Sequence, residues 1–500
     1  MMTPHRRSLV AALLAALCAL PAGTRAQSYP TMAAEPDPRD FVRRAGTQLT
    51  LLGVPFRFGG VDITWLGLRR DGSAPARRPT RYEVLDAMRT AQAMGAAVIR
   101  APGLADTGTC ALCLEQQAGQ LDDAALAHLD MVLASARDLG LKLILPLADS
   151  GRDCASPAEP GIICAAARLP GAGGAQAFFT DGQQMTAFTT RVRQLLDHRN
   201  TVDGIPYRDD PTILAWEDCD GCGGAAPDQA VSAWSDALGR AVKDADQRHL
   251  YETGAFPGRI GPGAANRVPA ALYAVHSADI VGDRPTLTGN TDSARDQLGA
   301  LTDEVSQSGH AYVLDALGWG AALWKTQADL DTWLSTVART RLVAGAIFGN
   351  LQAHAESGGW MPAQPATGPG LAALYFPGRA TGEMDLPTMQ ERGRALRRFD
   401  YLMGSVSQTP TYLLPDPPVL IAASHGRITW RGAAGAATYA IERSADPGQP
   451  GSWTVVCDAC VTDEAAAWQD QSPQTGAWYR MTPININGHK AEPSEPMQSN

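Results

Sequence analysis

The stretch RDDPTILAWEDCDGCGG, residues 208–224, decides the fold of this chain. Its centre, TILAWED (212–218), is a short and continuous apolar run that ends in two acidic residues. Such a run indicates a strand buried on both faces. The proline before it and the glycine-rich segment after it mark loops. A buried strand that delivers acidic side chains to a loop is typical of parallel α/β sheets, where ligands bind at the carboxyl ends of the strands.

The same pattern recurs on both sides of this stretch. Short apolar runs alternate with amphipathic helical segments such as DAALAHLDMVLASARDLG (123–140) and QQMTAFTTRVRQLLDHR (183–199). Strands separated by helices indicate a parallel sheet, and eight such strands predict a closed (β/α)8 TIM barrel, which is an α/β fold. We expect the strands at FRFGGVDIT (56–64), AAVIRAP (96–102), LKLILPLA (141–148), TILAWED (212–218), LYETG (250–254), LYAVHSA (272–278), AYVLDAL (311–317) and GAIFGNL (345–351).

A second unit follows the barrel. The proline-rich segment SQTPTYLLPDPPV (407–419) is typical of a linker. Later runs such as RITWRG (427–432) and AWYRMTPIN (477–485) alternate apolar and polar residues between turn signals. This alternation predicts a small all-β immunoglobulin-like sandwich. Its core and corner aromatics are expected to be Trp430, Tyr439 and Tyr479.

The first 26 residues predict a secretory signal peptide rather than part of the fold. A basic start at Arg6 and Arg7 precedes the apolar run LVAALLAALCAL (9–20), and the small Ala26 marks the expected cleavage site. No later run of about 20 apolar residues exists, so we expect no membrane span and export to the periplasm or the medium. The expected organisation is a signal peptide over 1–26, a barrel over 27–405, a Pro-rich linker over 406–417 and a β sandwich over 418–500.

The charge of the chain narrows its partners. The formal net charge is −10 and the isoelectric point is near 5.4. Nucleic-acid binding proteins carry basic patches, so a nucleic-acid partner is not expected. The acidic residues are dispersed, which indicates a solvated surface suited to a neutral ligand. We expect a monomer.

Nine cysteines are present, and eight remain when Cys18 leaves with the signal peptide. An even number of cysteines in an exported protein favours disulfides. A four-cysteine zinc site built from CALC (110–113) and CDGC (219–222) is the alternative, and redox activity is a third interpretation. The disulfide candidates are Cys110, Cys113, Cys154, Cys164, Cys219, Cys222, Cys457 and Cys460.

Several segments resemble a known family. FFTD (178–181) and RNTVDGIPYRDDPTILAWE (199–217) resemble glycoside hydrolase family 5, specifically its endo-β-1,4-mannanases. GGVDITWLG (59–67) and VIRAPG (98–103) resemble the first two strands of the same family. The C-terminal unit is similar to fibronectin type III modules, which are common appendages of secreted proteins that act on polysaccharides.

The resemblance implies a retaining mechanism, in which two glutamates about 5–5.5 Å apart act as acid/base and nucleophile. The family places its acid/base after an asparagine at the end of the fourth strand, where this chain has Asp220 and then Gly221. Glu217 matches a glutamate with a structural role. The family nucleophile belongs to an E-F-G pattern, and here Ala316 stands in its place. Asp315 precedes it, but neighbouring strand residues point to opposite faces, so we expect Asp315 to point away from the position of Ala316.

Other family positions follow the same trend. Arg100 is retained, and His276 in YAVHSAD matches a histidine expected at the end of the sixth strand. The tyrosine expected two positions later is Ala278, and Gly349 stands where the family has a sugar-stacking tryptophan. The resemblance therefore implies a site that keeps Arg100 and His276 but lacks both catalytic glutamates.

Candidate replacements were sought among the other acidic and aromatic residues. Asp220 and Asp315 are the candidate relocated catalytic carboxylates, with Asp149 and Asp62 as further options, although each aspartate could instead cap a helix or loop. Aromatic rings stack on sugars, so a groove of tryptophans could grip a polysaccharide, although ordinary packing is the alternative for each ring. The candidate substrate-binding residues are Trp65, Arg100, His276, Trp319 and Trp360.

The sequence thus predicts a secreted barrel that binds or modifies a β-linked polysaccharide such as mannan or a glucan. Because both family glutamates are replaced, we expect a carbohydrate-binding pseudoenzyme. One alternative is an active endo-β-mannosidase-type hydrolase that uses Asp220 and Asp315. Another is a structural or partner-binding protein of the envelope. No cofactor and no metal ion are expected.

Overall fold

A computed structural model describes the chain from residue 37 to residue 500 with gaps. The signal-peptide prediction over 1–26 and the residues Cys110, Cys154, Cys164 and Ala316 lie outside the described part. The described ranges are 37–68, 77–101, 112–115, 119–149, 163, 174–222, 225–254, 270–284, 291–315, 317–363, 372–449 and 451–500.

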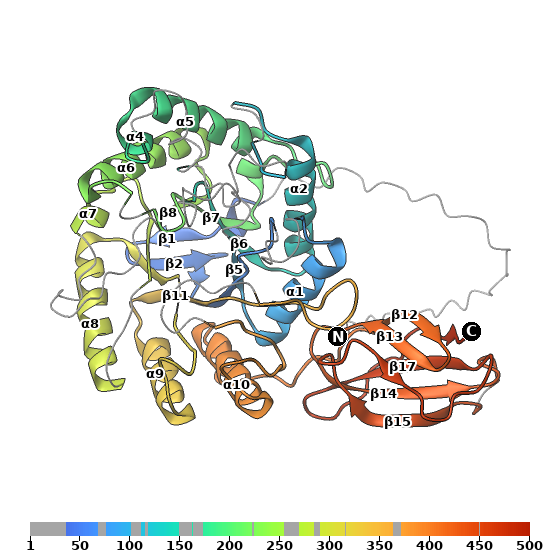
Figure 1. The fold of residues 1–500 in the computed structure, drawn as a ribbon. Helices are drawn as coiled ribbons and strands as arrows, with labels where there is room; N and C mark the ends of the chain where they lie inside the picture. The colour runs from blue at the N-terminus through green and yellow to red at the C-terminus, as the bar shows by residue number, and fades with distance from the viewer. Residues whose placement is uncertain are drawn as a thin grey trace, which may run out of the picture.

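Eight parallel strands close into a barrel and confirm the predicted (β/α)8 architecture (Figure 1). Each strand pairs with its neighbour in the chain, and the last strand pairs with the first. The barrel strands are β4 (Phe58–Asp62), β5 (Val98–Arg100), β6 (Lys142–Pro146), β7 (Ile213–Glu217), β8 (Leu250–Thr253), β9 (Ile280–Asp283), β10 (Ala311–Leu314) and β11 (Val343–Phe348).

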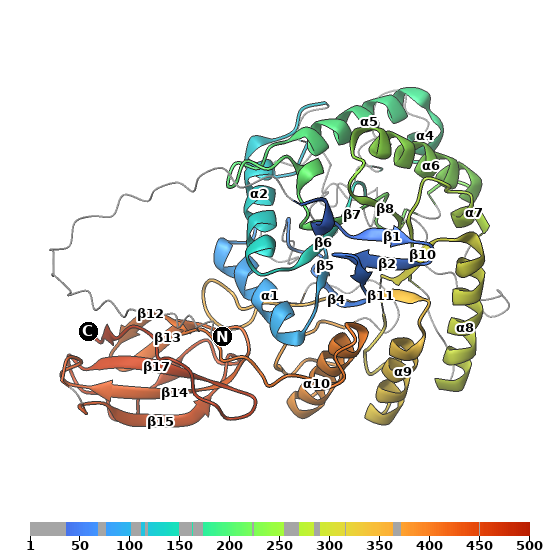
Figure 2. The same ribbon diagram turned by 180° about the vertical axis from the view of Figure 1, so that it is seen from behind.

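Helices surround the barrel on its outer side, as both views show (Figures 1 and 2). Their amphipathic faces bury leucine, valine and aromatic side chains against the strands. Local signals set their ends: the Thr80 hydroxyl and the Glu83 carboxylate form a capping box at the start of the first helix. The helices are α1 (Arg81–Met94), α2 (Asp123–Asp138), α4 (Ala177–Thr180), α5 (Gly182–Asp197), α6 (Asp228–Ala245), α7 (Ala270–Tyr273), α8 (Thr291–Ser308), α9 (Gln327–Arg339) and α10 (Leu386–Met403), with 3-10 turns η1 (Pro38–Asp40) and η3 (Tyr207–Asp209).

The barrel interior is apolar toward the amino-terminal ends of its strands. Each strand contributes one or two side chains to a buried cluster, and an antiparallel hairpin before the barrel adds Val42 and Leu49 to it. This hairpin consists of β1 (Arg43–Ala45), β2 (Gln48–Leu51) and β3 (Val54–Pro55). It closes the amino-terminal end of the barrel, so a ligand site is expected at the opposite end. The inward-facing cluster includes Phe58, Val98, Ile144, Ala215, Leu250, Ile280, Val313 and Ile347.

The prediction for the sixth strand was wrong. The segment 272–278 ends a short helix and continues as a turn, and the strand is Ile280–Asp283. The sequence IVGD is short and contains glycine and aspartate, whereas LYAVHSA is a longer apolar run, so the apolar pattern favoured the wrong segment. The correction changes which residues reach the carboxyl end of this strand.

The C-terminal β unit, residues 419–500, consists of two antiparallel sheets around one apolar cluster. Trp430, Tyr439 and Tyr479 are buried in this cluster, as expected. The unit lies beside α1 and α10 in both views (Figures 1 and 2). Its sheets are β12 (Val419–Ser424), β13 (Arg427–Arg431) and β16 (Trp468–Gln469), and β15 (Thr454–Val461), β14 (Ala436–Ser444), β17 (Trp478–Asn485) and β18 (Met497–Gln498).

The cysteines of the described part form disulfides. Cys219 is bonded to Cys222, and Cys457 to Cys460. Cys113 is also disulfide-bonded and buried. These cysteines are therefore not thiolates, and the zinc alternative built on them is not supported. Across the ranges given above, none of the helices is both long and apolar enough to span a bilayer.

Candidate functional site

A layer of charged side chains lies directly above the apolar interior of the barrel. Strand alternation places it there, because each of these residues follows an inward-facing apolar residue by an even number of positions. All of its members are buried, and they come from five different strands or strand ends. The layer consists of Asp62, Arg100, Glu217, Glu252 and Asp315.

Arg100 is the centre of this layer. Its Nε donates to Glu217 Oε2 at 2.7 Å and its Nη2 to Glu217 Oε1 at 2.5 Å, which is a bidentate pair. The same Nη2 donates to Asp220 Oδ1 at 3.0 Å. The Asp62 Oδ2 atom is 3.7 Å from Arg100 Nη1. The retained Arg100 and Glu217, the glutamate to which the resemblance gives a structural role, are thus joined.

Arg284 is a second cation of the site, and it was missed by the sequence analysis. It follows β9 directly, so its position became apparent only when the sixth strand was corrected. Its Nη2 forms an ion pair with Asp220 Oδ1 and is 3.6 Å from Glu217 Oε1. Arg284 and Asp220 keep 20% and 25% of their side chains exposed, so both reach the surface of the mouth.

Asp220 is held ionised between the two guanidinium groups. Burial alone would raise the pKa of Asp220, but the charges of Arg284 and Arg100 and their hydrogen bonds lower it well below its usual range. Its backbone N–H donates to Ala148 O at 2.9 Å, which ties the loop after β7 to the end of β6. An aspartate with such a low pKa does not deliver a proton at neutral pH.

Glu252 and Asp315 form a contrasting pair below the mouth. A side chain added at Gly282 would place its Cβ 2.3 Å from Asp315 Oδ2 and 2.7 Å from Glu252 Oε1, so both carboxyls lie over this glycine. No N–H group or hydroxyl of the described residues donates to any of their four oxygens, and the two carboxyls share a hydrogen bond with each other. Burial and then the charge of Glu217 raise the pKa of Asp315 to about 7. Burial and then the charge of Asp315 raise the pKa of Glu252 well above its usual value.

Asp315 points into the barrel. It follows the inward-facing Val313 by two positions, and the strand keeps its alternation to this point. Because Ala316 lies outside the described residues, the predicted opposition of these two positions stays a prediction. Asp315 is 0% exposed, so it contacts other carboxyls and no solvent.

The site holds more carboxyl groups than cations. Arg100 and Arg284 face five carboxyls, those of Asp62, Glu217, Asp220, Glu252 and Asp315. Burial also raises the pKa of Asp62 to about 7, although Arg100 opposes this shift. Within the described ranges, no group of three or more His, Cys, Asp or Glu residues is arranged to hold a metal ion. Protonation is therefore how the described residues relieve the excess negative charge.

The loop after β7 contains Gly221, the residue that the family resemblance predicts at the acid/base position. Gly221 has a left-handed φ of 67°, and a Cβ added there would meet Arg284 Nη1 at 3.6 Å. The loop is anchored by the Cys219–Cys222 disulfide and by the buried Asp218 carboxylate, which accepts from Cys219 N at 2.6 Å and Gly254 N at 2.8 Å. The loop is thus rigidly built in a shape that glycine favours.

The three candidate tryptophans are packed side chains in this structure. The Trp65 indole is buried and donates to Leu351 O at 2.7 Å, and the buried Trp319 indole donates to Gly349 O at 2.7 Å. Trp360 is 9% exposed. In this structure the rings pack between loops and barrel, which was the alternative given for each of them. Their contact with a sugar stays a prediction.

His276 does not lie at the mouth. It is an exposed residue in the turn before β9, and it lies near His310, which directly precedes β10. Both positions are at the amino-terminal end of the barrel strands. The prediction that His276 ends the sixth strand is corrected together with the strand itself, and the cation at the corresponding strand end is Arg284.

Comparison with known proteins identifies mannanase-like relatives. Residues 172–278 match a family model described as GH family 5 beta-mannosidase-like. Over 253 residues, 49% of this chain and 50% of the relative, the chain is 35% identical to the putative mannan endo-1,4-beta-mannosidase 5 of Oryza sativa subsp. japonica. Over 232 residues, 46% and 52% of the two chains, it is 32% identical to mannan endo-1,4-beta-mannosidase 1 of the same organism. The chain spans about half the length of these curated relatives.

Solved structures with the same fold include two mannanases. The endo-beta-1,4-mannanase from Thermotoga petrophila matches with a TM-score of 0.56 and 15% identity over 90% of this chain and 98% of that chain. The endo-1,4-beta-mannanase from Rhizomucor miehei matches with a TM-score of 0.51 and 20% identity over 62% and 90%. At these identities the likeness shows the barrel fold alone.

Proposed function

We propose that this chain is a mannanase-like barrel that binds a β-linked polysaccharide, β-mannan or a glucan, and has lost the two-glutamate retaining cleavage. The observation that carries the proposal is the end of β7. Gly221 stands at the acid/base position without a carboxyl group, and the neighbouring Asp220 is tied to Arg100 and Arg284. The residues that would transfer a proton have been replaced by a fixed ion-pair network.

The rate enhancement that the missing groups would supply is large, which favours loss of the retaining cleavage. General acid–base catalysis contributes roughly 10²–10⁴-fold in rate, and a retaining enzyme without its nucleophile forms no covalent intermediate. Asp220 is ionised and paired, so it is a weak base and a poor acid. The sequence places Ala316 at the nucleophile position, which offers no substitute.

Polysaccharide binding is supported by the place of the polar groups and by the relatives. Ligands of TIM barrels bind at the carboxyl ends of the strands. Here Asp220 and Arg284 keep part of their side chains exposed at that end, where they can hydrogen-bond to sugar hydroxyls. The curated relatives are named as mannan endo-1,4-beta-mannosidases, which makes β-mannan the first ligand to test.

The remaining parts of the proposal concern the setting of the protein. We propose export through the segment 1–26, for which the disulfides Cys219–Cys222 and Cys457–Cys460 give support because such bonds persist in oxidising compartments. The two antiparallel sheets of the C-terminal β unit support an immunoglobulin-like sandwich of the fibronectin type III kind. We also propose that the protein acts as a monomer.

Hydrolysis with relocated carboxylates is the second candidate function. The observation in its favour is that the environments of neighbouring carboxyls push their pKa values apart, as in enzymes that use one carboxylic acid and one carboxylate. Asp220 stays ionised, whereas burial raises the pKa of Asp315 and of Asp62 to about 7. The complete burial of Asp315 opposes this candidate, since a catalytic acid must reach its substrate.

One experiment separates these functions. Protein spanning residues 27–500 is incubated for a day with mannan, glucomannan and β-glucan, and reducing ends and pull-down are measured on the same samples. Binding without release, weakened by Asp220→Asn and unaffected by the exposed control Asp331→Asn, supports the proposal. Release that disappears in Asp220→Ala or Asp315→Ala supports relocated hydrolysis. If the protein neither binds nor cleaves any of the three polysaccharides, the result contradicts both functions and favours a partner-binding envelope protein.

A further inference from the structure

The loop that follows the last barrel strand lies between the barrel and the C-terminal β unit. This loop, residues 351–363, is called the mouth loop here because it leaves the carboxyl end of β11. One of its residues, His354, is 0% exposed and faces an aspartate on each side. The imidazole Nδ1 is 2.9 Å from Asp86 Oδ2 of α1, and its Nε2 is 3.2 Å from Asp463 Oδ2 of the C-terminal β unit.

The geometry makes His354 a buried cation. Both ring nitrogens face carboxylate oxygens, so both must carry a proton to be satisfied. Burial alone would lower the pKa of His354, but the charges of Asp86 and Asp463 raise it to about 10. The backbone N–H of His354 also donates to Asp86 Oδ2 at 2.8 Å, which holds this part of the loop on α1.

Asp463 is a rigid anchor on the other side. It accepts from Trp430 Nε1 at 2.8 Å and from the Tyr439 hydroxyl at 2.6 Å, and both aromatics belong to the core of the C-terminal β unit. A carboxylate with these two donors has a fixed orientation. His354 therefore contacts the core of the neighbouring unit rather than a flexible surface side chain.

Close packing holds the loop in the same position. The Trp360 ring stacks on His354 with 3.9 Å between centroids. A Cβ added at Gly432 would lie 2.4 Å from His354 Cδ2, and one added at Gly358 would lie 2.6 Å from Trp430 O. The backbones of the loop and of the C-terminal β unit thus approach as closely as glycine allows.

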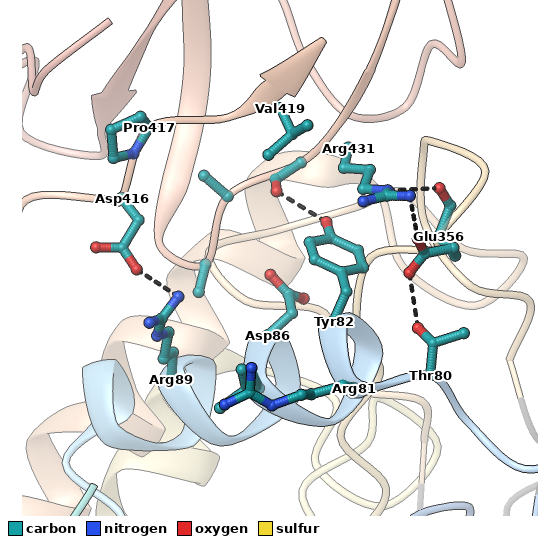
Figure 3. Close-up of a pocket in the computed structure, with 14 residues that line it drawn as sticks. Thr80, Arg81, Tyr82, Asp86, Arg89, Glu356, Asp416, Pro417, Val419 and Arg431 are labelled. Carbon is teal, nitrogen blue, oxygen red and sulfur yellow. Dashed lines mark hydrogen bonds and ion pairs between the residues drawn. The ribbon is translucent and has the colours of Figure 1, made fainter. Parts of the chain in front are cut away.

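The edge of this contact is polar and bounds a groove of about 500 Å³ (Figure 3). Glu356 of the mouth loop forms an ion pair with Arg431 and accepts from the Thr80 hydroxyl at 2.7 Å. The Tyr82 hydroxyl of α1 donates to Gly432 O at 2.8 Å. These contacts join the same three parts, α1, the mouth loop and the C-terminal β unit, that His354 joins in the interior.

The other end of the mouth loop reaches the candidate site. Leu351 N donates to Asp62 O at 2.9 Å, and Leu351 O accepts from Trp65 Nε1 at 2.7 Å. Just before the loop, Asn350 Nδ2 donates to the Thr64 hydroxyl at 2.6 Å. The end of the first barrel strand, with Asp62 of the charged layer, is therefore held by a segment that ends three residues before His354.

We propose that His354 is a positioning residue through which the C-terminal β unit holds the mouth loop, and with it the end of β4, in the conformation that binds polysaccharide. That the ligand is a polysaccharide rests on the proposed function, whereas the positioning of the mouth loop by His354 does not. The C-terminal β unit is then a structural support of the site and acts without contacting the ligand.

The test uses the full mature chain with His354→Gln, which keeps a polar side chain of similar reach but carries no charge. His198→Gln is the matched control, because His198 also pairs with a buried aspartate, Asp130 at 3.0 Å, on a part of the barrel away from the C-terminal β unit. Amide hydrogen exchange is measured for 62–66 and 350–356 under conditions where all variants are folded, together with affinity for β-1,4-linked mannohexaose.

The proposal expects faster exchange in both segments for His354→Gln but not for His198→Gln. It also expects an affinity loss of about 3- to 30-fold. Asp463→Asn combined with His354→Gln should lose no more affinity than the more damaging single change, because the two residues act through one contact. This non-additivity distinguishes positioning from a general loss of stability.

Two results overturn the proposal. The first is unchanged amide exchange of residues 62–66 in His354→Gln. The second is unchanged affinity of His354→Gln for mannohexaose when the wild-type protein binds it. If the wild type binds no mannohexaose, the proposed function fails, and the exchange measurement alone still decides whether His354 positions the mouth loop.

Discussion

Two buried charge clusters of this protein are built in opposite ways. At the mouth, two guanidiniums face five carboxyls, and the oxygens of Glu252 and Asp315 accept from no N–H group or hydroxyl of the described residues and hydrogen-bond only with each other. At the domain junction, one imidazolium sits between two carboxylates. One of these, Asp463, also accepts from Trp430 and Tyr439. The mouth gathers groups of like charge, whereas at the junction each carboxylate faces the imidazolium.

The difference separates a site from an anchor. Buried polar groups are normally paired, and clusters that leave them unpaired lose stability that a purely structural arrangement would keep. Perturbed carboxyls gathered at one end of a barrel are typical of functional sites. A charge triad of alternating sign between two units is typical of a fixed interface. We therefore expect substitutions at the junction to lower stability and some substitutions at the mouth to raise it.

Loss of Arg100 should have the largest effect. In Arg100→Met, Glu217 loses its bidentate partner and Asp220 keeps only Arg284. Breaking a buried ion pair by removing one partner costs about 3–5 kcal/mol of unfolding free energy. Urea unfolding measures this cost. Arg398→Met, which removes an exposed partner of Asp331, is the control and should change little. A cost for Arg100→Met below about 1 kcal/mol would show that the mouth carboxyls do not depend on this cation.

Alkaline pH should loosen the junction. The pKa of His354 is raised to about 10 in the folded protein, above the value of about 6.5 for a free histidine. The stabilisation is fully present below pH 6.5 and is lost as pH rises through 10, so about 2–4 kcal/mol should disappear between pH 7 and pH 10. Unfolding free energies across this range measure the loss. His354→Gln should remove this part of the pH dependence, and equal slopes for variant and wild type contradict it.

Rising pH should also destabilise the mouth, but over a lower pH range than the junction, and substitution of the titrating residue should stabilise the protein instead of destabilising it. Burial raises the pKa of Asp315 to about 7, so the folded state binds a proton that the unfolded state releases near pH 4. Stability contributed by this proton is lost as pH rises from about 4 to about 7. Asp315→Asn removes the titration, and its amide can donate to Glu252. We expect Asp315→Asn to be about 1–3 kcal/mol more stable than wild type at pH 8 and nearly equal at pH 4. A destabilised variant at pH 8 contradicts this, and Asp331→Asn is the exposed control.

The smallest expected effect concerns the loop after β7. Gly221→Ala places a Cβ at a left-handed φ of 67°, which costs about 1 kcal/mol, and it creates no carboxyl group. Gly182→Ala is the control because a Cβ there meets no neighbour within 4 Å and its φ is not left-handed. Thermal unfolding measures both variants. Equal melting temperatures would show that the strained loop is not fixed by its glycine.

The barrel could be predicted from local patterns, and its sixth strand shows where such patterns fail. Most strands stand out as apolar runs between helices, and the alternation within AYVLDAL already fixes Val313 and Asp315 on one face. The four-residue strand IVGD carries little of this signal, because a glycine and an aspartate take half of its positions. The wrong assignment of the sixth strand placed His276 in the predicted site and left Arg284 out of it. Glu252 was also missed, since a buried acid inside LYETG looks locally like any strand residue.

The sequence alone determined the barrel and predicted the disulfides of the motifs Cys219–Cys222 and Cys457–Cys460, because each depends on patterns of residues that are close along the chain. The replacement of the family acid/base by Gly221 stays a prediction of the resemblance. Only the tertiary structure decided which charges meet. Arg284 pairs with Asp220, and His354 with Asp463, across long stretches of sequence. Electrostatic energies depend on distance through space and on burial, and neither is written into local periodicity. Barrel closure and the docking of the C-terminal β unit produced both clusters, and with them the charge of each group.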